Sequence, residues 1–162
     1  MIIGFTGTQA GMNQFQKDEV VKLFNAHQPR ELHHGDCIGA DSQCHYLFLN
    51  WHIDNDTVSR KIIIHPPLNF SKRAFTADFT KYSHGLKEKL ANCKYKIVIE
   101  TLDEKAYLER NRDIVDAVQV MIATPKEIDH TLRSGTWSTI RYSWHQRKET
   151  IVIPPLSKEN VK

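Results

Sequence analysis

A glycine–threonine turn near the C-terminal end of the sequence carries the clearest chemical signal. The stretch Arg133-Ser134-Gly135-Thr136-Trp137-Ser138-Thr139-Ile140-Arg141 follows the apolar run at 118–123 and opens an amphipathic segment. This pattern predicts that Ser134, Gly135 and Thr136 form the first turn of a helix. The first N–H groups of a helix lack partners within the helix and carry a partial positive charge, so this turn favours an anion such as phosphate.

Three further turns follow apolar runs: Thr6-Gly7-Thr8, His34-Gly35-Asp36 and His65-Pro66-Pro67. Glycine lets a backbone approach a ligand closely, and threonine hydroxyls can donate to phosphate oxygens. The first turn lacks the Gly-x-Gly-x-x-Gly fingerprint of dinucleotide sites. Such turns recurring in one small chain indicate a nucleotide-like ligand, although a tight turn without a ligand also explains Thr6-Gly7-Thr8.

Two aspartates flank a predicted helix start within His34-Gly35-Asp36-Cys37-Ile38-Gly39-Ala40-Asp41. Carboxylates at such a position complement the helix dipole, and we interpret Asp41 in this way. Asp36 keeps two interpretations. It either stabilises the same helix start or accepts hydrogen bonds from ribose hydroxyls, as an acidic residue does in dinucleotide sites.

Arg110 and Asn111 are adjacent strong donors on a predicted helix. The guanidinium fork of arginine matches the geometry of a phosphate group, so both residues are candidate ligand contacts. A surface ion pair with Glu109 or Asp113 is the alternative for Arg110.

Three histidines fall at predicted strand ends, namely His33, His34 and His65. A metal site needs three or four converging donors, and no such spacing is visible here. We therefore expect no metal and no cofactor, and we expect these histidines to hydrogen-bond to a ligand or to the backbone. The cysteines are odd in number and show no metal-type pairing, which indicates a reducing, intracellular setting.

The bulk composition indicates one soluble domain spanning residues 1–162. Hydrophobic residues make up 40% of the chain and charged residues 25%, which is ordinary for a globular protein. The net charge of +3 permits an anionic ligand but is too mild to indicate a nucleic-acid partner. No apolar run approaches the roughly 20 residues of a membrane span, and no signal-peptide pattern is present, so we expect a cytoplasmic protein without a membrane partner.

Short apolar runs alternate with helical patterns along the chain. This alternation predicts an α/β, Rossmann-like single domain with a mostly parallel central sheet and helices on both faces. Strands are expected at 2–6, 31–34, 61–65, 95–99, 118–123 and 150–153. Helices are expected at 12–27, with Asn13 and Gln16 as a capping box, at 40–51, at 103–118 with Asp103 as the cap, and from 135 onward. We expect an irregular insertion or lid at 66–95, a loop at 126–133 and a polar tail at 156–162.

Four motifs in this order resemble the SLOG superfamily: Gly4-Phe5-Thr6-Gly7-Thr8, the 34–41 turn, Tyr107-Leu108-Glu109-Arg110-Asn111 and the 133–141 stretch. This Rossmann-like group includes the DNA-processing Smf/DprA proteins and the LOG phosphoribohydrolases, and the likeness is greatest to its small bacterial and phage members. The resemblance implies a nucleotide-type ligand. By likeness to LOG dimers it also implies a homo-oligomer. The helix face that carries Trp137, Arg141 and Trp144 is a candidate interface. Arg141 has two further interpretations, since it could stack on the two tryptophan rings or reach the ligand.

The resemblance implies less about catalysis. LOG enzymes carry a Pro-Gly-Gly-x-Gly-Thr-x-x-Glu motif, whose glutamate works with an arginine of the preceding helix to cleave an N-glycosidic bond. Arg110 matches that arginine, but aligning Gly135-Thr136 onto the motif leaves Ser138 and Thr139 where carboxylates belong. Neither hydroxyl can act as a carboxylate base, so binding without turnover is the favoured hypothesis.

The favoured ligand is a phosphorylated nucleoside derivative, of the ADP-ribose or cyclic-nucleotide type. The protein would act as a sensor or a sequestering protein. If a phage encodes it to counter a host defence that uses nucleotide signals, it would act in the host cytoplasm. One alternative is a nucleoside 5'-phosphate N-glycosidase that takes its acid from Asp36, Asp41 or Glu109. A second is single-stranded DNA binding, as in DprA, through the lysines of 72–96. The predicted ligand contacts are Thr6, Gly7, Thr8, His34, Gly35, Asp36, Arg110, Asn111, Ser134, Gly135 and Thr136.

Overall fold

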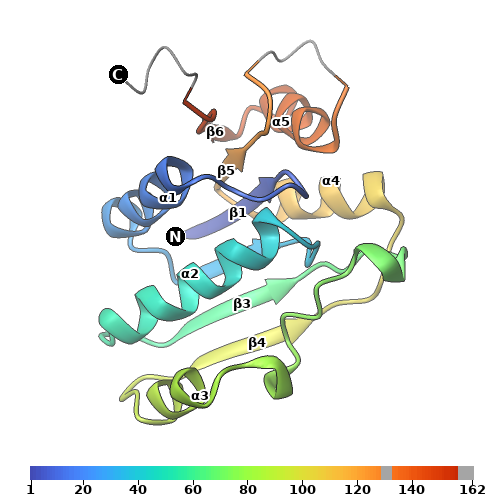
Figure 1. The fold of residues 1–162 in the computed structure, drawn as a ribbon. Coiled ribbons are helices and arrows are strands. Elements are labelled where there is room, and N and C mark those ends of the chain that lie inside the picture. Colours follow the sequence, from blue (N-terminus) through green and yellow to red (C-terminus); the bar gives the residue numbers. More distant parts are fainter. Residues whose placement is uncertain (129–132, 157–162) are drawn as a thin grey trace.

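A computed structural model describes residues 1–128 and 133–156, in which six parallel strands form one sheet (Figure 1). Their order across the sheet is β4-β3-β2-β1-β5-β6. All five strand pairings are parallel, which confirms the predicted Rossmann-like architecture. The strands are β1 (Ile2–Gly7), β2 (Glu31–His34), β3 (Arg60–Ile64), β4 (Ile97–Thr101), β5 (Val120–Thr124) and β6 (Glu149–Val152).

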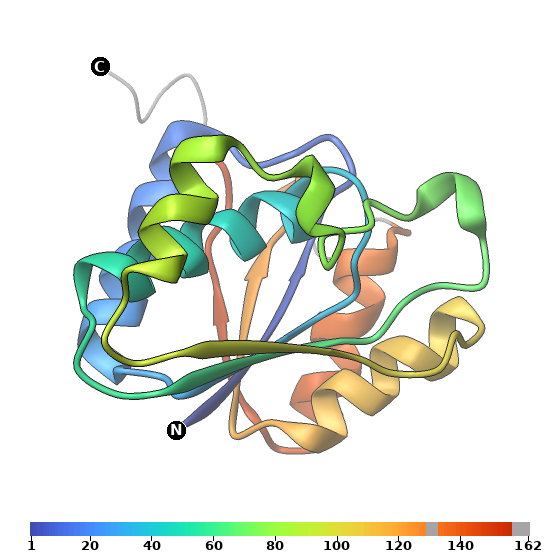
Figure 2. The ribbon, with the colours of Figure 1, turned by 90° about the horizontal axis from the view of Figure 1, so that it is seen from below.

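Helices cover both faces of the sheet, as expected (Figure 2). One face carries α1 (Gln14–His27), α2 (Ala40–Asp54) and α3 (His84–Ala91), and the other carries α4 (Tyr107–Ala117) and α5 (Gly135–His145). On the second face α4 packs on β1 and β2 while α5 packs on β5 and β6. The outer strands β3 and β4 therefore extend past α4, and Val98 of β4 is 53% exposed on this side. None of the described helices is both long and apolar enough to cross a bilayer.

The larger core lies under α1 and α2, where strand alternation directs every second side chain. Ile3 and Phe5 of β1 pack there against Phe24 of α1 and Phe48 of α2. The capping box predicted at the start of α1 is present: the Asn13 side chain accepts from the Gln16 N–H while the Gln16 side chain accepts from the Asn13 N–H.

Two predicted elements were wrong. Asp103 does not cap α4, which begins at Tyr107 after Ala106 without a side-chain cap. The residues before α4 instead extend along the loop that follows β3, because the Lys105 N–H donates to the Pro66 carbonyl and the Lys105 carbonyl accepts from the Leu68 N–H.

The second error concerns 66–95, which is not irregular throughout. It contains 3-10 turns at Phe70–Lys72 and Phe79–Lys81 and the two-turn helix α3, which Ser83 caps. Only Leu86 and Leu90 of α3 pack on the core, so its apolar pattern was too short to detect. Residues 157–162 of the predicted tail and residues 129–132 of the predicted 126–133 loop lie outside the described residues.

Candidate functional site

The sheet has its topological switch point between β1 and β5, where successive connections diverge to opposite sides of β1. Ligands of open α/β sheets bind beyond the carboxyl ends of the strands at such a point. A hollow of about 230 Å³ lies there. We call it the switch-point hollow, and its described lining is Thr8, Lys126, Glu127, Arg133, Ser134 and Thr136.

The first turn of α5 forms one wall of the switch-point hollow. Ser134 is the N-cap residue, and its hydroxyl accepts from Trp137 N–H at 3.0 Å. The N–H groups of Gly135 and Thr136 lie in this first turn, where a helix offers no acceptor of its own. The helix start therefore presents N–H donors and a partial positive charge, as predicted from the sequence.

The remaining lining residues strengthen this preference for an anion. Lys126 and Arg133 contribute two positive charges against the single carboxylate of Glu127. The volume is below the roughly 300–1,000 Å³ of pockets that enclose whole drug-sized ligands. The hollow therefore suits the phosphate-bearing end of a larger molecule.

Thr8 is fixed at the opposite wall by backbone contacts. Its N–H donates to the Thr124 carbonyl at 3.3 Å, and its carbonyl accepts from Ala40 N–H at 3.0 Å. Its hydroxyl oxygen accepts from Ala10 N–H, which leaves the hydroxyl proton free to donate to a ligand. The Thr124 hydroxyl, directly beside this loop, is one of two buried side-chain atoms that lack a hydrogen-bond partner within the described residues. Thr124 was not among the residues predicted from the sequence, because it directly follows an apolar run that indicated only a strand.

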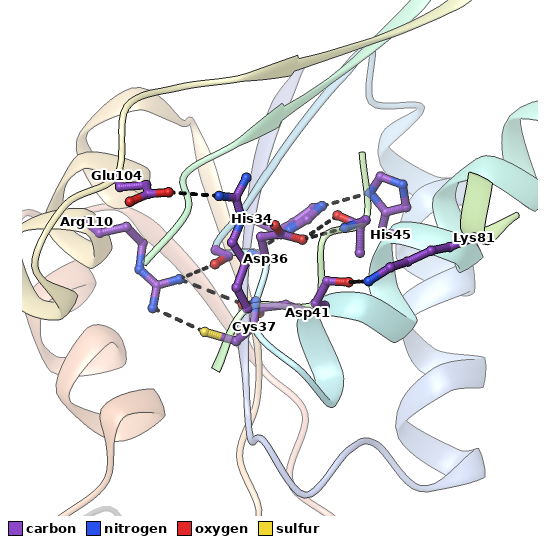
Figure 3. A network of polar contacts seen from close by, with 12 residues as sticks. His34, Asp36, Cys37, Asp41, His45, Lys81, Glu104 and Arg110 are labelled. Atoms are coloured by element: carbon purple, nitrogen blue, oxygen red, sulfur yellow. Dashed lines mark hydrogen bonds and ion pairs between the residues drawn. The ribbon is translucent and has the colours of Figure 1, made fainter. Parts of the chain in front are cut away.

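A second group of predicted residues forms a buried polar network around the turn that follows β2 (Figure 3). Arg110 is 3% exposed, and its Nη1 donates to the Gly35 carbonyl at 2.7 Å. The guanidinium also lies 3.9 Å from the Asp41 carboxylate and packs on the Tyr107 ring at 4.6 Å. The alternative of a surface ion pair is therefore wrong, and Arg110 instead ties α4 to the turn after β2. The other buried atom without a partner in the described residues is Nε of this arginine.

Asp36 also has a role inside the protein. Its carboxylate is fully buried and accepts from Thr76 N–H at 2.9 Å, from the Thr76 hydroxyl at 2.6 Å and from Arg73 Nε at 3.0 Å. The interpretation of Asp36 as a ribose acceptor is corrected, because both oxygens are committed to residues 73–76. Asp41 lies in the first turn of α2 as predicted, where it accepts from Cys37 N–H, and burial raises the pKa of its carboxyl to about 6.

His34 begins a one-way chain of hydrogen bonds in the same network. Its Nδ1 accepts from Asp36 N–H at 3.0 Å, so its Nε2–H must donate to His45 Nδ1 at 2.9 Å. His45 Nε2–H then donates to the Tyr82 oxygen at 2.8 Å, and the Tyr82 hydroxyl donates to the Thr76 carbonyl. Burial lowers the pKa of His34 well below its usual value and that of His45 to about 4. Together with Asp36, this chain holds the segment at 73–82 against β2 and α2.

The glycines of the predicted phosphate turns are required by packing. A Cβ on Gly35 would lie 1.5 Å from Arg110 Nη1, and one on Gly135 would lie 2.6 Å from the Tyr107 hydroxyl. A Cβ on Gly7 would lie 2.5 Å from the Cβ of Ala40. These close approaches seat α4 and α2 on the turns, and they account for the glycines without any ligand.

Replacing Gly35 by alanine is expected to lower the free energy of unfolding by about 1–3 kcal/mol, because the new methyl group overlaps the buried Arg110 guanidinium, which is bonded to the Gly35 carbonyl. Gly85, in the exposed first turn of α3, is a matched control, since nothing lies within 4 Å of its added Cβ. Gly85→Ala should be neutral or stabilising by up to about 1 kcal/mol. Urea unfolding of both variants measures the contrast, and equal effects would contradict the assigned role of Gly35.

The remaining predicted contacts lie apart from the switch-point hollow. Asn111 lines a groove of about 380 Å³ between α4 and α5, together with Ser138 and Thr139. No carboxylate is among the described residues that line this groove. Thr6 lies within β1, paired with Ala123 of β5.

The predicted interface face is split by the fold. Trp137 is 5% exposed and packs in a small core with Ile140 and Ala123, whereas Trp144 is 45% exposed. Trp137 is therefore a core residue, whereas the exposed Trp144 and Arg141 stay candidate interface contacts.

One group of described side chains has donors close enough to hold a metal ion, namely His52, Asp56 and Cys93. Both ring nitrogens of His52 are already engaged, since Nδ1 lies 2.9 Å from Arg60 Nη1 and Nε2 lies 2.9 Å from the Tyr95 carbonyl. A neighbouring arginine also repels a cation, so this group does not fit a metal site.

Comparison with known proteins identifies the fold. No protein-family model matches the sequence, and no curated protein matches it. The X-ray structure of DNA processing protein A (DprA) from Streptococcus pneumoniae superposes with a TM-score of 0.62 over 98% of this chain, at 15% sequence identity. The chain corresponds to about half of that protein, 52% of its length. This likeness supports the fold expected from the sequence, so the protein is a Rossmann-like domain whose fold is similar to that of DprA.

Proposed function

We propose that the protein binds the phosphate-bearing end of a nucleotide-type ligand in the switch-point hollow. The observation that carries this proposal is the convergence of the α5 helix start, the Thr8 hydroxyl and two cations on one hollow at the switch point. ADP-ribose-type molecules and cyclic nucleotides are the preferred ligands, and the protein would act as a sensor or a sequestering protein.

Binding without turnover remains our preference over the N-glycosidase. Asp36 and Asp41, two of the acids that such an enzyme could use, are buried and engaged in internal hydrogen bonds. Glu109 is exposed and lies 3.8 Å from Lys105 Nζ. Among the described residues that line the switch-point hollow, Glu127 is the one with a carboxylate, so it is the acid to test if turnover is detected.

Native mass spectrometry of the purified protein, followed by titration with ADP-ribose and with cyclic nucleotides, tests this proposal. Arg133→Ala is expected to weaken binding of the identified nucleotide by about tenfold, since a charge-assisted hydrogen bond contributes about 1.5–3 kcal/mol. Arg112→Ala is the matched control, because Arg112 lines the α4–α5 groove instead. Equal effects of the two variants would contradict the site, and release of a free base or a sugar phosphate would favour the glycosidase.

Single-stranded nucleic acid is the second candidate, although the net charge of +3 is too mild to indicate such a partner. The fold neighbour is a DNA-processing protein, and one surface of this chain suits unpaired bases. Phe70 is 72% and Phe79 54% exposed, on short turns that also carry Lys72 and Lys81. Exposed aromatic rings stack on bases and lysines neutralise phosphates. Affinity for an oligonucleotide that falls steeply with salt would favour this candidate.

A further inference from the structure

A second buried relay of polar side chains lies on the sheet face that carries α4. Glu31 Oε1 is 2.6 Å from His33 Nε2, and His33 Nδ1 is 2.8 Å from His65 Nε2. His33 is 6% and His65 5% exposed, with their ring centres 5.0 Å apart. Sequence reasoning noted both histidines at strand ends but did not connect them to each other or to Glu31.

The chemistry of the three groups fixes the direction of this relay. A carboxylate only accepts, so His33 Nε2 carries the proton that is donated to Glu31. Burial lowers the pKa of both histidines, that of His65 to about 4, so each ring is neutral and has one N–H. His33 Nδ1 must then accept from His65 Nε2–H. The relay leaves His65 Nδ1 with a lone pair and without a hydrogen bond to the described residues. Nδ1 is not one of the fully buried side-chain atoms without a partner, so it is open to the space beside it.

His65 lines a hollow of about 500 Å³ between α4 and the segments that follow β3 and β4. We call it the α4–β4 hollow. Arg110 also lines it, and Nε of this buried arginine lacks a partner in the described part of the chain. One unused acceptor and one unused donor, on side chains that are more than nine-tenths buried, therefore border the same space. Buried polar groups without partners are uncommon, which indicates a ligand or bound solvent at this point.

The charges around the α4–β4 hollow restrict the ligand. Asp103, Asp113 and Asp116 line it and oppose a phosphate group. Lys105 and Arg110 oppose a bare cation, and Lys105 Nζ already donates to Asp113 at 2.6 Å. A neutral hydroxyl group avoids both penalties, because it donates through its proton and accepts through its oxygen.

We propose that the α4–β4 hollow is a second ligand site, separate from the switch-point hollow, for a neutral polyhydroxyl ligand such as a free sugar or a nucleoside. A hydroxyl of that ligand donates to His65 Nδ1, and a hydroxyl or ring oxygen accepts from Arg110 Nε. The volume is within the roughly 300–1,000 Å³ range of small-molecule sites. The Glu31–His33 pair acts on His65 by fixing its tautomer and is not itself in contact with the ligand.

Titration of the protein with D-ribose and with adenosine, followed through the imidazole ¹⁵N signals, tests the second site. We expect the His65 Nδ1 signal to move with at least one of these probes, and the protein's affinity for inorganic phosphate to be unaffected by either. His65→Phe should weaken binding of that probe at least about tenfold, since it removes a hydrogen bond to a buried group. His65→Asn places its side-chain oxygen near the position of Nδ1 and should retain part of the affinity.

Two results overturn the inference: imidazole signals of the unmodified protein that stay constant with both probes, or a His65→Phe variant that binds the probe as tightly as the parent. The first measurement needs no variant, so it decides the question even if His65→Phe does not fold. Phosphate binding in the switch-point hollow is measured in the same samples, and failure of that binding leaves the second site untouched.

Discussion

Replacing Asp36 by alanine is expected to lower the free energy of unfolding by about 3–5 kcal/mol, the cost of breaking a buried ion pair by removing one partner. The change removes the buried one of the two carboxylates that pair with Arg73, whose side chain is 14% exposed, and it removes the acceptor for both the N–H and the hydroxyl of Thr76. It also places alanine at a backbone φ of +54°, which alanine tolerates less well than aspartate does. Chemical denaturation followed by circular dichroism measures the loss.

A matched control separates burial from charge in this prediction. Arg73 pairs at 3.0 Å with Glu104 as well as with Asp36, but the Glu104 side chain is 47% exposed. Glu104→Gln should cost less than about 1 kcal/mol, as exposed ion pairs do. Asp36→Asn should fall between the two, because an amide oxygen can still accept from Thr76 and asparagine tolerates a positive φ. A loss at Asp36 no larger than the loss at Glu104 would contradict the structural role of this carboxylate.

The fold was predictable because its signals are local. Each strand is a short apolar run and each long helix has a clear stripe, such as Ala40, Cys44, Phe48 and Trp51 in α2, all of which are buried. The capping box joins Asn13 to Gln16, which are only three positions apart. The helix α3 was missed because two leucines are too few to establish a period, and the start of α4 was misplaced because a loop distant in sequence pairs with the residues before it.

The candidate site was predictable only where its physics is local. The start of α5 is set by neighbouring residues, so the sequence predicted the helix start at Ser134, Gly135 and Thr136, and their contact with an anion stays a prediction. Asp36 and Arg110 were assigned to the ligand, but their partners are 40 and 75 residues away, at Thr76 and Gly35. No spacing rule reveals such partners.

Arg110 still contributes to the candidate site, because it helps to position the first turn of α5. Arg110 holds the Gly35 carbonyl and stacks on Tyr107, and the Tyr107 hydroxyl packs so closely on Gly135 that a Cβ there would lie 2.6 Å away. The helix α4 thus connects the turn after β2 to the first turn of α5. Arg110→Ala is consequently a structural change, and a loss of ligand affinity in that variant says little about direct contact.

Stability is expected to fall as the pH drops from about 6.5 to about 4. The pKa of His45 is lowered from 6.5 to about 4, and that of His34 is also well below 6.5, because their rings are buried and their nitrogens are committed to the chain that ends at Tyr82. A group with a depressed pKa binds a proton more readily when the chain is unfolded, so unfolding is favoured throughout that interval. For His45 alone the shift corresponds to about 3 kcal/mol.

Protonation of Asp41 has the opposite effect on stability over the same pH range. Its pKa is raised to about 6 by burial, so its contribution to stability increases as the pH falls from about 6 toward 3.8. His34, His45 and His65 together outweigh this single carboxyl, and the net effect of acid is destabilising. Urea unfolding between pH 7.5 and pH 4.5 measures the slope.

The variant His45→Leu distinguishes this mechanism from general acid sensitivity. It leaves His34 Nε2–H without its acceptor and should be less stable than the parent at pH 7.5, by about 1–3 kcal/mol for a buried unpaired donor. It also removes one of the titrating rings, so the difference from the parent should shrink as the pH falls. If the gap between the two proteins stays constant down to pH 4.5, protonation of this chain is not what destabilises the fold. A stability difference that shrinks with falling pH means that the hydrogen bonds holding the segment at 73–82 against β2 and α2 depend on neutral His34 and His45. Neither histidine reveals this requirement by its place in the sequence.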